Sequence, residues 1–499
     1  MRIVAGIQNR PESVNEAPPC RCRRACSRGC VWAEPQQSTR PQPSSPSLRP
    51  AWTRSAPLLH APKRNRYGPR PAARPQRRTP TATRTQQHTV TRELRAYLLA
   101  NVAFLVPSGV VTIVFPWLIV VALHESPERV GIAQMITQLP ALFLLLFAGW
   151  VADRIEQRRI LIVTQVLVAV AQLGIAALIF THSLTFNSLL GLALLAGIAG
   201  TFSGPPRDAM LGRVAGAQIQ RAVMLIIGLQ FAAQIVGYWI ASKTDEFGPT
   251  GLLVFAAALF ALASVPCMQL PESKPTRGTG GTGGTGGKSA NLFAEIAVGL
   301  RVAMRSERIR PALILTFALG MFFVGSFVVL LPLIIRDVYH GGATDLSLAF
   351  GANMAGTLVV IGVLMARGVV LRQGRAFMIA LVFGSVVLAS LSLRPPYWAF
   401  FALSFVWGLG GGLTMTMGRA IVQEAAPPEL AARLLSIYAF AMSAGMPIGS
   451  LTIGYAAKAW GTLNAALLPS IGMIATVLLV HLTSSCWRQT ALEHAAQPA

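Results

Sequence analysis

VGIAQMITQLPALFLLLFAGWVADRIEQRRILIVTQVLVAVAQLGIAALIFT, residues 130–181, consists of two apolar runs that flank the basic segment Gly149–Arg159. Each run has about 20 residues, so as an α-helix it is long enough to cross the roughly 30 Å hydrocarbon core of a bilayer. Both runs are apolar on every face, whereas a helix of a soluble protein keeps one polar face. The stretch therefore predicts two membrane-spanning helices joined by a short polar loop.

Outward from this stretch, the same pattern repeats along the chain. Hydrophobic residues make up 53% of the 499 residues and charged residues only 12%, about half the charged fraction of an average soluble domain. The predicted spans are 97–122, 130–151, 160–181, 187–204, 221–242, 250–270, 312–335, 346–366, 376–393, 398–418, 434–456 and 463–484. Six spans, a polar linker and six more spans suggest a duplicated transporter with its substrate site between the halves.

The net charge of +24 does not indicate nucleic-acid binding, because of where the basic residues lie. Of the 43 Lys and Arg residues, 19 precede residue 96. Another 19 lie in the central linker, in the C-terminal tail and in the loops on the linker's side of the predicted membrane. The opposite side carries five: Arg129, Lys243, Arg336, Arg394 and Lys458. By the positive-inside rule this bias predicts that both termini are cytoplasmic.

The segments outside the spans divide the chain into a tail at 1–90, a six-helix bundle at 91–270, a linker at 271–310, a second bundle at 311–485 and a tail at 486–499. The basic, Pro- and Ser-rich tail at 1–90 is expected to be disordered. Its four cysteines lack the paired spacing of a zinc site. The linker ends in Gly287-Lys288-Ser289, but Thr282 stands where a phosphate-binding loop needs glycine, which favours a flexible linker. Residues 292–304 then predict an amphipathic surface helix or a plain connector helix.

The segment Gly149–Arg159 (GWVADRIEQRR) resembles the signature loop of the major facilitator superfamily, both in spacing and in its position between the second and third spans. Gly149 is expected to let a neighbouring helix approach closely. Asp153 could meet a helix N-terminus and nearby arginines. The resemblance implies an all-α membrane protein with about twelve helices in two six-helix bundles, a central cavity and alternating access. It also implies that a conformational latch is formed by Gly149, Asp153, Arg154, Arg158 and Arg159.

Further segments resemble the enterobactin-exporter-like branch of the superfamily. They are Leu331–Val338, Val422–Leu430 with Arg433, Gly445–Gly449 and Pro206–Leu211, and the likeness covers about residues 92–485. Two departures stand out. The second half's counterpart of the signature loop, 362–375, has no acid, and Gly237 is followed by Tyr238 where drug-antiporter relatives carry a Gly-Pro pair.

Candidate cavity residues are mostly uncharged, because the predicted spans hold no Asp, Glu, Lys or Arg away from their ends. Gln134 and Gln138 are one helical turn apart, as are Gln230 and Gln234, so each pair shares a helix face. Each pair could line the cavity or join two helices by hydrogen bonds. Phe323 and Trp407 could contribute apolar cavity walls. The glycines between residues 408 and 412 suggest close packing or a bend.

An ion-coupling step would have to use an acid at a span edge, such as Asp337 or Glu424, or be absent. The sequence shows no nucleophile–base arrangement and no metal-ligand spacing, so neither an enzyme nor a cofactor is expected. We expect a monomeric, multi-pass protein of the bacterial inner membrane that exports amphipathic small molecules, with the lipid bilayer and the substrate as its partners. The alternatives are an uptake facilitator or lipid-related carrier, and a non-transporting membrane sensor or scaffold.

Overall fold

The computed structural model describes residues 80–215, 219–270, 292–367, 372–427 and 430–484. All of them belong to the second of the two units into which the chain divides, residues 77–499. Within these ranges the regular elements are helical. The predicted tails, the cysteines of residues 20–30 and the Gly-Lys-Ser end of the linker lie outside the described residues, as do some side chains within helices, including that of Asp153.

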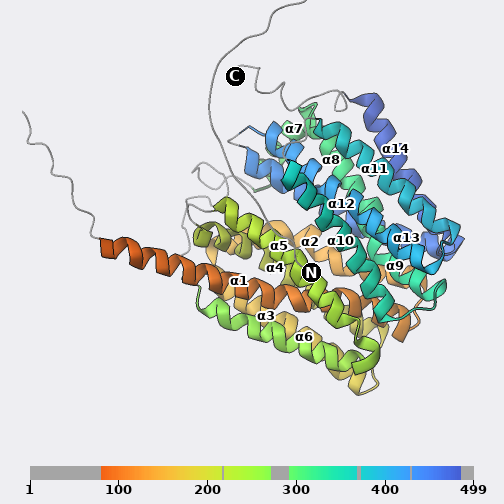
Figure 1. The fold of residues 1–499 in the computed structure, drawn as a ribbon, viewed down its shortest axis with the longest axis horizontal. Helices are drawn as coiled ribbons and strands as arrows, with labels where there is room; N and C mark the ends of the chain where they lie inside the picture. Colours follow the sequence, from red (N-terminus) through yellow and green to blue (C-terminus); the bar gives the residue numbers. More distant parts are fainter. Residues whose placement is uncertain (1–79, 216–218, 271–291, 368–371, 428–429, 485–499) are drawn as a thin grey trace, which may run out of the picture. The chain divides into compact units, whose positions relative to one another are not determined.

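The first half of the described structure consists of helices α1–α6. Their bounds are α1 Pro80–Trp117, continued by the π-helical turn η1 Leu118–Ala122, α2 Pro127–Arg154, α3 Gln157–Phe180, α4 Phe186–Ala215, α5 Ile219–Ala241 and α6 Thr244–Met268. These helices lie together as one group, coloured orange to lime in Figure 1. Contacts of α3 with α4 and α6, and of α1 with α5 and α6, hold the group together.

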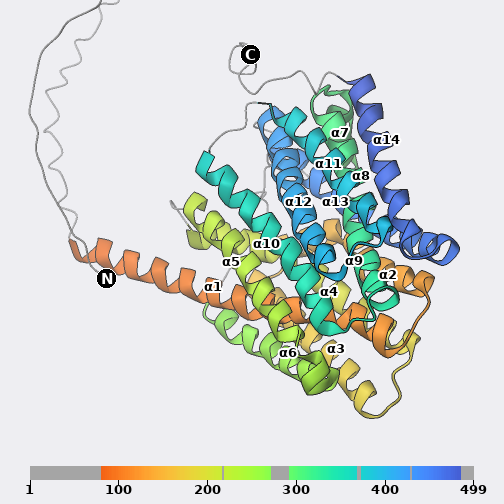
Figure 2. The ribbon, with the colours of Figure 1, turned by 45° about the vertical axis from the view of Figure 1, so that its right-hand side comes forward.

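After α7 (Leu292–Arg305), the second half consists of helices α8–α14. Their bounds are α8 Ile309–Ala318, η3 Leu319–Val324, α9 Gly325–Asp337, α10 Ala343–Arg367, α11 Gln373–Ser390, η4 Leu391–Leu393, α12 Tyr397–Ala425, α13 Ala431–Trp460, η5 Asn464–Ala466 and α14 Leu467–Thr483. The elements α8, η3 and α9 follow one another without a break and form a single span. Figure 2 shows this second group, green to blue, beside the first.

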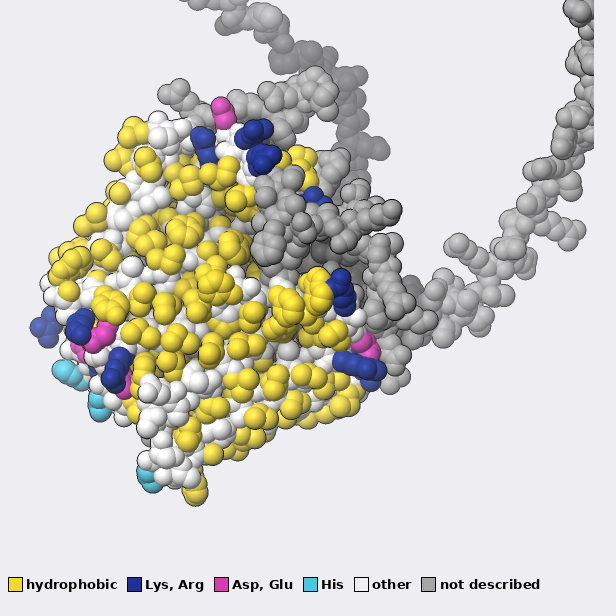
Figure 3. Space-filling model, turned by 180° about the vertical axis from the view of Figure 1, so that it is seen from behind, with side chains coloured by type: hydrophobic (Ala, Val, Ile, Leu, Met, Phe, Trp, Pro, Cys, Tyr) yellow, Lys and Arg dark blue, Asp and Glu magenta, His cyan; other side chains and the backbone are white. Residues whose placement is uncertain are grey.

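The prediction of an all-helical membrane protein is confirmed. Ten helices in the described ranges are long and apolar enough to cross a membrane. Helices α2 and α5, of 28 and 23 residues, occupy the other two predicted spans. The exterior agrees with this assignment, because Figure 3 shows a broad apolar surface with charged side chains gathered at its two ends. Such a surface suits contact with lipid tails.

Glycines set how closely several helices pack. A Cβ on Gly109 of α1 would lie 2.8 Å from the carbonyl oxygen of Gln234 on α5, and a Cβ on Gly237 would lie 2.8 Å from the Cα of Gly109. Real Cβ atoms essentially never come so close to a neighbouring atom. In the second half, a Cβ on Gly412 of α12 would lie 2.9 Å from the carbonyl oxygen of Thr357 on α10. The close packing expected for the glycines of α12 is therefore present.

Two segments differ in detail from the sequence-based expectation. Helix α1 begins at Pro80, about ten residues before the end of the predicted tail. Proline suits a first helical turn because its missing N–H is not needed there. Helix α7 packs against α13 through Gly299, while Leu300 and Met304 remain exposed. These contacts fit both predictions for this segment, the amphipathic surface helix and the connector helix.

Candidate functional site

The two halves meet most closely where the start of α2 crosses the end of α13. A Cβ on Gly131 would lie 2.6 Å from the carbonyl oxygen of Ser450, so α13 approaches the backbone of α2 directly. Two helical turns further along α2, Gln138 donates a hydrogen bond from Nε2 to the hydroxyl of Ser450, at 3.1 Å. Gln138, predicted as a cavity or helix-packing residue, thus joins the two halves.

Polar contacts reinforce this junction at its rim. Lys458 at the end of α13 forms an ion pair with Glu128 at the start of α2, at 2.7 Å. Arg336 of α9 donates to the carbonyl oxygen of Glu125, at 2.7 Å. The backbone N–H of Ala343 on α10 donates to Asp245 Oδ2 on α6, at 3.1 Å. We call this part of the molecule, where the α1–α2, α5–α6, α9–α10 and α13–α14 connections meet, the closed end.

Glu128 is the acid at the closed end whose protonation depends on a partner from the other half. The hydrogen bond from Lys458 is the largest of the influences that hold the pKa of this carboxyl below its usual range. The ion pair therefore favours the charged form of Glu128 while the two halves are in contact. Separation of the halves would remove that effect.

The predicted latch lies at the opposite end, which we call the basic end. Arg154 stacks over the ring of Trp150, with its guanidinium carbon 3.7 Å from the ring centroid. Arg159 pairs with Glu156 at 2.7 Å, within the same loop, and Arg158 is half-buried. The space around a Cβ on Gly149 is open to 4 Å. The close helix approach expected at Gly149 is therefore not present in this structure.

Side chains along α2 change environment between the two ends. Val130 and Ala133, near the closed end, are buried. Phe143, Phe147 and Trp150, beyond Gln138 towards the basic end, are exposed. The close packing of α2 against α13 thus belongs to the closed end, and it explains why Gly149 has no neighbour.

One pair of opposite charges faces across the halves at the basic end without direct contact. Asp208 on α4 and Arg419 on α12 are close enough to interact electrostatically, but they are not among the described ion pairs within 4 Å. The named ion pairs at this end, such as Arg308 with Glu424 at 3.8 Å, join residues of one half. Asp208 and Arg419 thus provide one attraction of opposite charges between the halves at this end.

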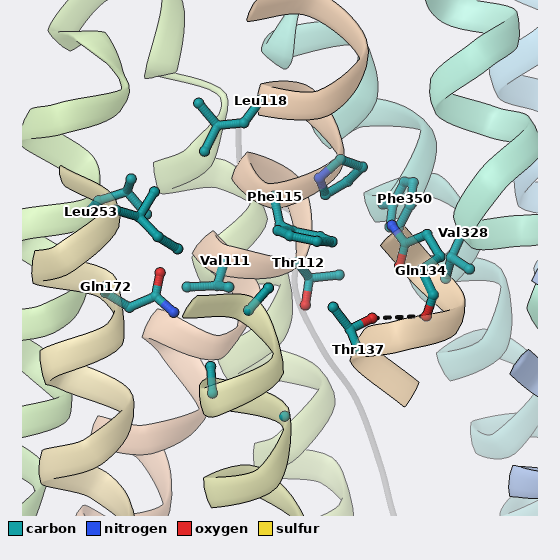
Figure 4. A pocket seen from close by; sticks show the side chains of 15 residues that line it. Val111, Thr112, Phe115, Leu118, Gln134, Thr137, Gln172, Leu253, Val328 and Phe350 are labelled. Carbon is teal, nitrogen blue, oxygen red and sulfur yellow. Dashed lines mark hydrogen bonds between the residues drawn. The ribbon is translucent and has the colours of Figure 1, made fainter. Parts of the chain in front are cut away.

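A cavity of about 240 Å³ lies among the helices of the first half and reaches two residues of the second. Its walls come from α1, α2, α3, α4 and α6, with Val328 of α9 and Phe350 of α10 completing them. Figure 4 shows Gln134, Thr112 and Phe115 around it, with Gln172 on the opposite wall. The cavity is largely apolar, with a few polar groups, as is usual for small-molecule sites.

Gln172 is a cavity residue that our reading of the sequence missed. The predicted cavity glutamines occur in pairs one helical turn apart, and Gln172 has no such neighbour. Its only signal was Gln165, seven residues earlier and thus on a similar face of α3. Gln165 is buried and hydrogen-bonds to the thiol of Cys267, whereas Gln172 lines the cavity.

The remaining predicted cavity residues lie elsewhere. Phe323 and Trp407 are both buried in the core of the second half, where their rings meet edge to face with centroids 6.0 Å apart. Gln230 is exposed and Gln234 half-buried on α5. The structure thus brings Gln134 and Gln138 to the region between the halves but does not bring the second pair into the cavity wall.

The two candidate coupling acids lie at opposite ends of the molecule. Asp337 pairs with Arg336 at 2.6 Å and accepts a hydrogen bond from Thr462 at the closed end. Glu424, at the basic end, accepts a hydrogen bond from Gln373 at 2.6 Å. The described residues contain no group of three or more His, Cys, Asp and Glu side chains arranged to hold a metal ion.

Comparison with known proteins assigns this architecture to a family. The sequence profile of the Major Facilitator Superfamily matches residues 97–450. The chain is 26% identical over 402 residues to the multidrug efflux pump Tap of Mycobacterium tuberculosis (strain ATCC 25618 / H37Rv), which covers 77% of this chain and 91% of Tap. It is 22% identical over 343 residues to macrolide efflux protein A of Streptococcus pyogenes, which covers 64% of this chain and 80% of that protein.

Solved structures show the same fold. The nucleoside transporter NupG superposes with a TM-score of 0.62 at 13% identity, covering 78% of this chain and 98% of NupG. A bacterial homologue of the human lysosomal transporter Spinster, solved in an inward-facing, unoccupied conformation, superposes with a TM-score of 0.59 at 12% identity. That match covers 82% of this chain and 99% of the homologue.

Proposed function

The chain belongs to the Major Facilitator Superfamily, and we propose that it exports amphipathic small molecules from the bacterial cell by alternating access. It is a membrane transporter and not an enzyme. The observation that carries the proposal is the arrangement of the two halves, which are joined at the closed end while the space beside Gly149 at the basic end is open. A transporter that alternates between two accesses needs one end closed while the other is free to open.

The basic end is the cytoplasmic end in this proposal. Its loops, the linker and the C-terminal tail carry 19 basic residues against five on the other side, the bias expected for cytoplasmic loops. Both termini are then cytoplasmic. The structure corresponds to the state that is closed to the outside, in which a substrate enters from the cell or from the inner leaflet.

The latch residues act in the opposite state. When the basic end closes, the second half approaches α2, and Gly149 gives it room to do so. Asp153 and Arg154 can then form polar contacts with that half, and Arg158 and Arg159 add positive charge beside them. In the state described here Arg154 instead rests on Trp150, so the latch is released.

The direction of transport follows from the relatives, since Tap and macrolide efflux protein A are named as efflux proteins. Within the superfamily we place the chain in the enterobactin-exporter-like branch, on the segments Leu331–Val338 and Gly445–Gly449. Asp337 and Glu424 are the proposed coupling acids, because the predicted spans hold no acid away from their ends and these two lie at span edges.

Efflux from a pump-deficient bacterial host tests the proposal. Cells that express the wild type, Asp153→Asn or the control Glu307→Gln at matched membrane levels are loaded with a panel of fluorescent amphipathic dyes. Glu307 is an exposed acid in the linker-side region, outside the signature loop. We expect the wild type and the control to export at least one dye and Asp153→Asn to export it poorly. If none of the three lowers dye retention, amphipath export is refuted.

A further inference from the structure

Among the described residues that line the cavity, the side chains able to form hydrogen bonds come from the first half. Thr112 lies on α1, Gln134 and Thr137 on α2, and Gln172 on α3. The second half contributes Val328 and Phe350, which are apolar. The first half therefore supplies both polar and apolar lining, whereas the second half supplies apolar side chains only.

The two hydroxyls among these side chains already have partners. Thr112 donates to the carbonyl oxygen of Ser108 at 2.8 Å. Thr137 donates to the carbonyl oxygen of Gln134 at 2.9 Å, the bond drawn in Figure 4. Both are bonds to the preceding turn of the same helix, so they leave the hydroxyls little capacity to donate to a ligand.

The two glutamine amides differ from the hydroxyls. Neither side chain forms a hydrogen bond to a residue in the described ranges, although Gln172 is only 2% exposed and Gln134 only 7%. The Oε1 atom of Gln172 is buried without a partner. Burial of a polar group without a hydrogen-bond partner raises the free energy of the protein, and a ligand that supplies a partner removes this penalty. Each amide can donate and accept hydrogen bonds.

The charge and the volume of the cavity restrict the chemical class of ligand that it can bind. No Asp, Glu, Lys or Arg is among the described residues that line the cavity, so a charged group placed here would be desolvated without a counter-charge. The volume of about 240 Å³ is below the roughly 300–1,000 Å³ of a typical ligand pocket. The cavity therefore suits one uncharged part of a larger amphipathic molecule.

We propose that Gln172 and Gln134 form a subsite that recognises an uncharged hydrogen-bonding group of the substrate, of the primary carboxamide type. The apolar body of the substrate then contacts Phe115 and the residues of the second half. This inference rests on the proposed function for its biological meaning. The expected binding itself is inferred from the residues of the cavity and does not depend on the direction or existence of transport.

The test uses four probes that share one apolar fluorophore and differ at one end. The ends are a primary carboxamide, an N,N-dimethylamide, a methyl ester and a trimethylammonium group. Binding to the purified full-length protein in lipid nanodiscs is measured by fluorescence anisotropy for the wild type, Gln172→Leu and Gln165→Leu. Gln165 is the matched control, because it is a buried glutamine two turns away on α3 that bonds to Cys267 and does not line the cavity.

We expect the wild type to bind the carboxamide about three- to tenfold more tightly than the dimethylamide, the range for one net hydrogen bond. Gln172→Leu should remove this preference while it retains dimethylamide binding, and Gln165→Leu should keep it. Equal binding of both probes by the wild type, or an unchanged preference in Gln172→Leu, overturns the subsite. The second result would mean that the amide serves only a bound water. Tightest binding of the trimethylammonium probe also overturns it.

Efflux of the same probes from whole cells separates this inference from the proposed function. Carboxamide-selective binding that depends on Gln172, without export of any probe, supports the subsite and refutes the exporter. Export of the probes without a carboxamide preference in binding supports the exporter and refutes the subsite.

Discussion

Gly131 on α2 and Gly454 on α13 face each other so closely that a Cβ on Gly454 would lie 2.8 Å from the Cα of Gly131. This contact crosses from one half of the transporter to the other, so it forms and breaks with the closed end. The absence of side chains at both positions lets the two backbones meet. A substitution here should therefore act on the balance between the two states more than on the folding of either half.

Gly131→Val should disfavour the closed end by about 1–3 kcal/mol, the usual cost of overpacking. The population should then shift towards the outward-open state by about fivefold to more than a hundredfold. A Val328→Cys reporter in the cavity wall should then react faster with an impermeant maleimide added outside spheroplasts.

Gly191→Val is the matched control, because the space around a Cβ at Gly191 is open. An equal labelling rate in Gly131→Val and wild type would show that this contact does not govern closure.

The Glu128–Lys458 ion pair predicts a dependence of closure on external pH. The pKa of Glu128 is lowered when the halves meet. The stabilisation is therefore present above the ordinary carboxyl pKa of about 4.3 and is lost as the pH falls through the lowered pKa. Since the pair is partly exposed, its contribution should be about 0.2–1 kcal/mol.

The rate of labelling of the same reporter is divided by that of a free cysteine peptide at the same pH, because acid lowers the thiolate fraction of both. This relative rate should rise modestly between pH 7 and about pH 3.5 in the wild type, across the ordinary carboxyl pKa. Glu128→Gln should label at the faster rate at both pH values. The exchange Glu128→Lys with Lys458→Glu should restore slow labelling at neutral pH. A Glu128→Gln variant with the full wild-type pH dependence would assign the effect to other acids of the closed end, such as Asp245.

Asp208 and Arg419 should approach each other when the basic end closes. Arg419→Asp places two acids opposite each other, and we expect it to lower the rate of export several-fold, because like charges oppose closure. Combining it with Asp208→Arg should restore much of the rate, while Arg419→Lys should have little effect. Efflux is measured at matched expression for Arg419→Asp, Asp208→Arg, the double variant and Arg419→Lys. Failure of the exchange to recover more than either single variant would mean that the two side chains do not meet.

Gly237 should be required for stability, because α1 passes directly beside it. Gly237→Val should destabilise the first half by about 1–3 kcal/mol and lower the midpoint of thermal unfolding in detergent. Gly228→Val, on the same helix, is the control, since the space around a Cβ at Gly228 is open. Similar midpoints for the two variants would contradict the close packing of α1 against α5.

The spans could be predicted from the sequence because membrane helices must be apolar along a fixed length. Helix α3 at Gln157–Phe180 and α11 at Gln373–Ser390 lie within a few residues of the predicted ranges. Contacts that depend on the conformational state could not be predicted in this way. The signature loop indicates that Gly149 meets a neighbour in one state, but a sequence does not say which state a structure shows.

The cavity was less predictable than the fold. A glutamine at helical spacing can line a cavity, bond to another helix or lie on a face that the protein leaves uncovered. Gln134, Gln138 and Gln230 respectively show these three cases. Phe323 and Trp407 pack against each other in the core, since large aromatic side chains fill interiors more often than they line binding sites. The face of a span that points towards the cavity depends on the rotation of the helix about its axis. Packing against neighbouring helices sets this rotation, and it cannot be deduced from apolar composition.

The hydrogen-bonding side chains of the cavity belong to the first half alone, and this has a consequence for how a cargo bound to them would move. A molecule held by hydrogen bonds from α2 and α3 travels with the first half, and these bonds need not break as the second half swings past. The sliding surface is Val328 and Phe350, whose contacts are non-directional and therefore tolerant of shape. The hydrogen bonds to the polar group would then form when the cargo binds and break when it leaves, and they would not add to the energy barrier of the conformational change. Cargoes with unrelated carbon skeletons could therefore be carried by the same transport cycle.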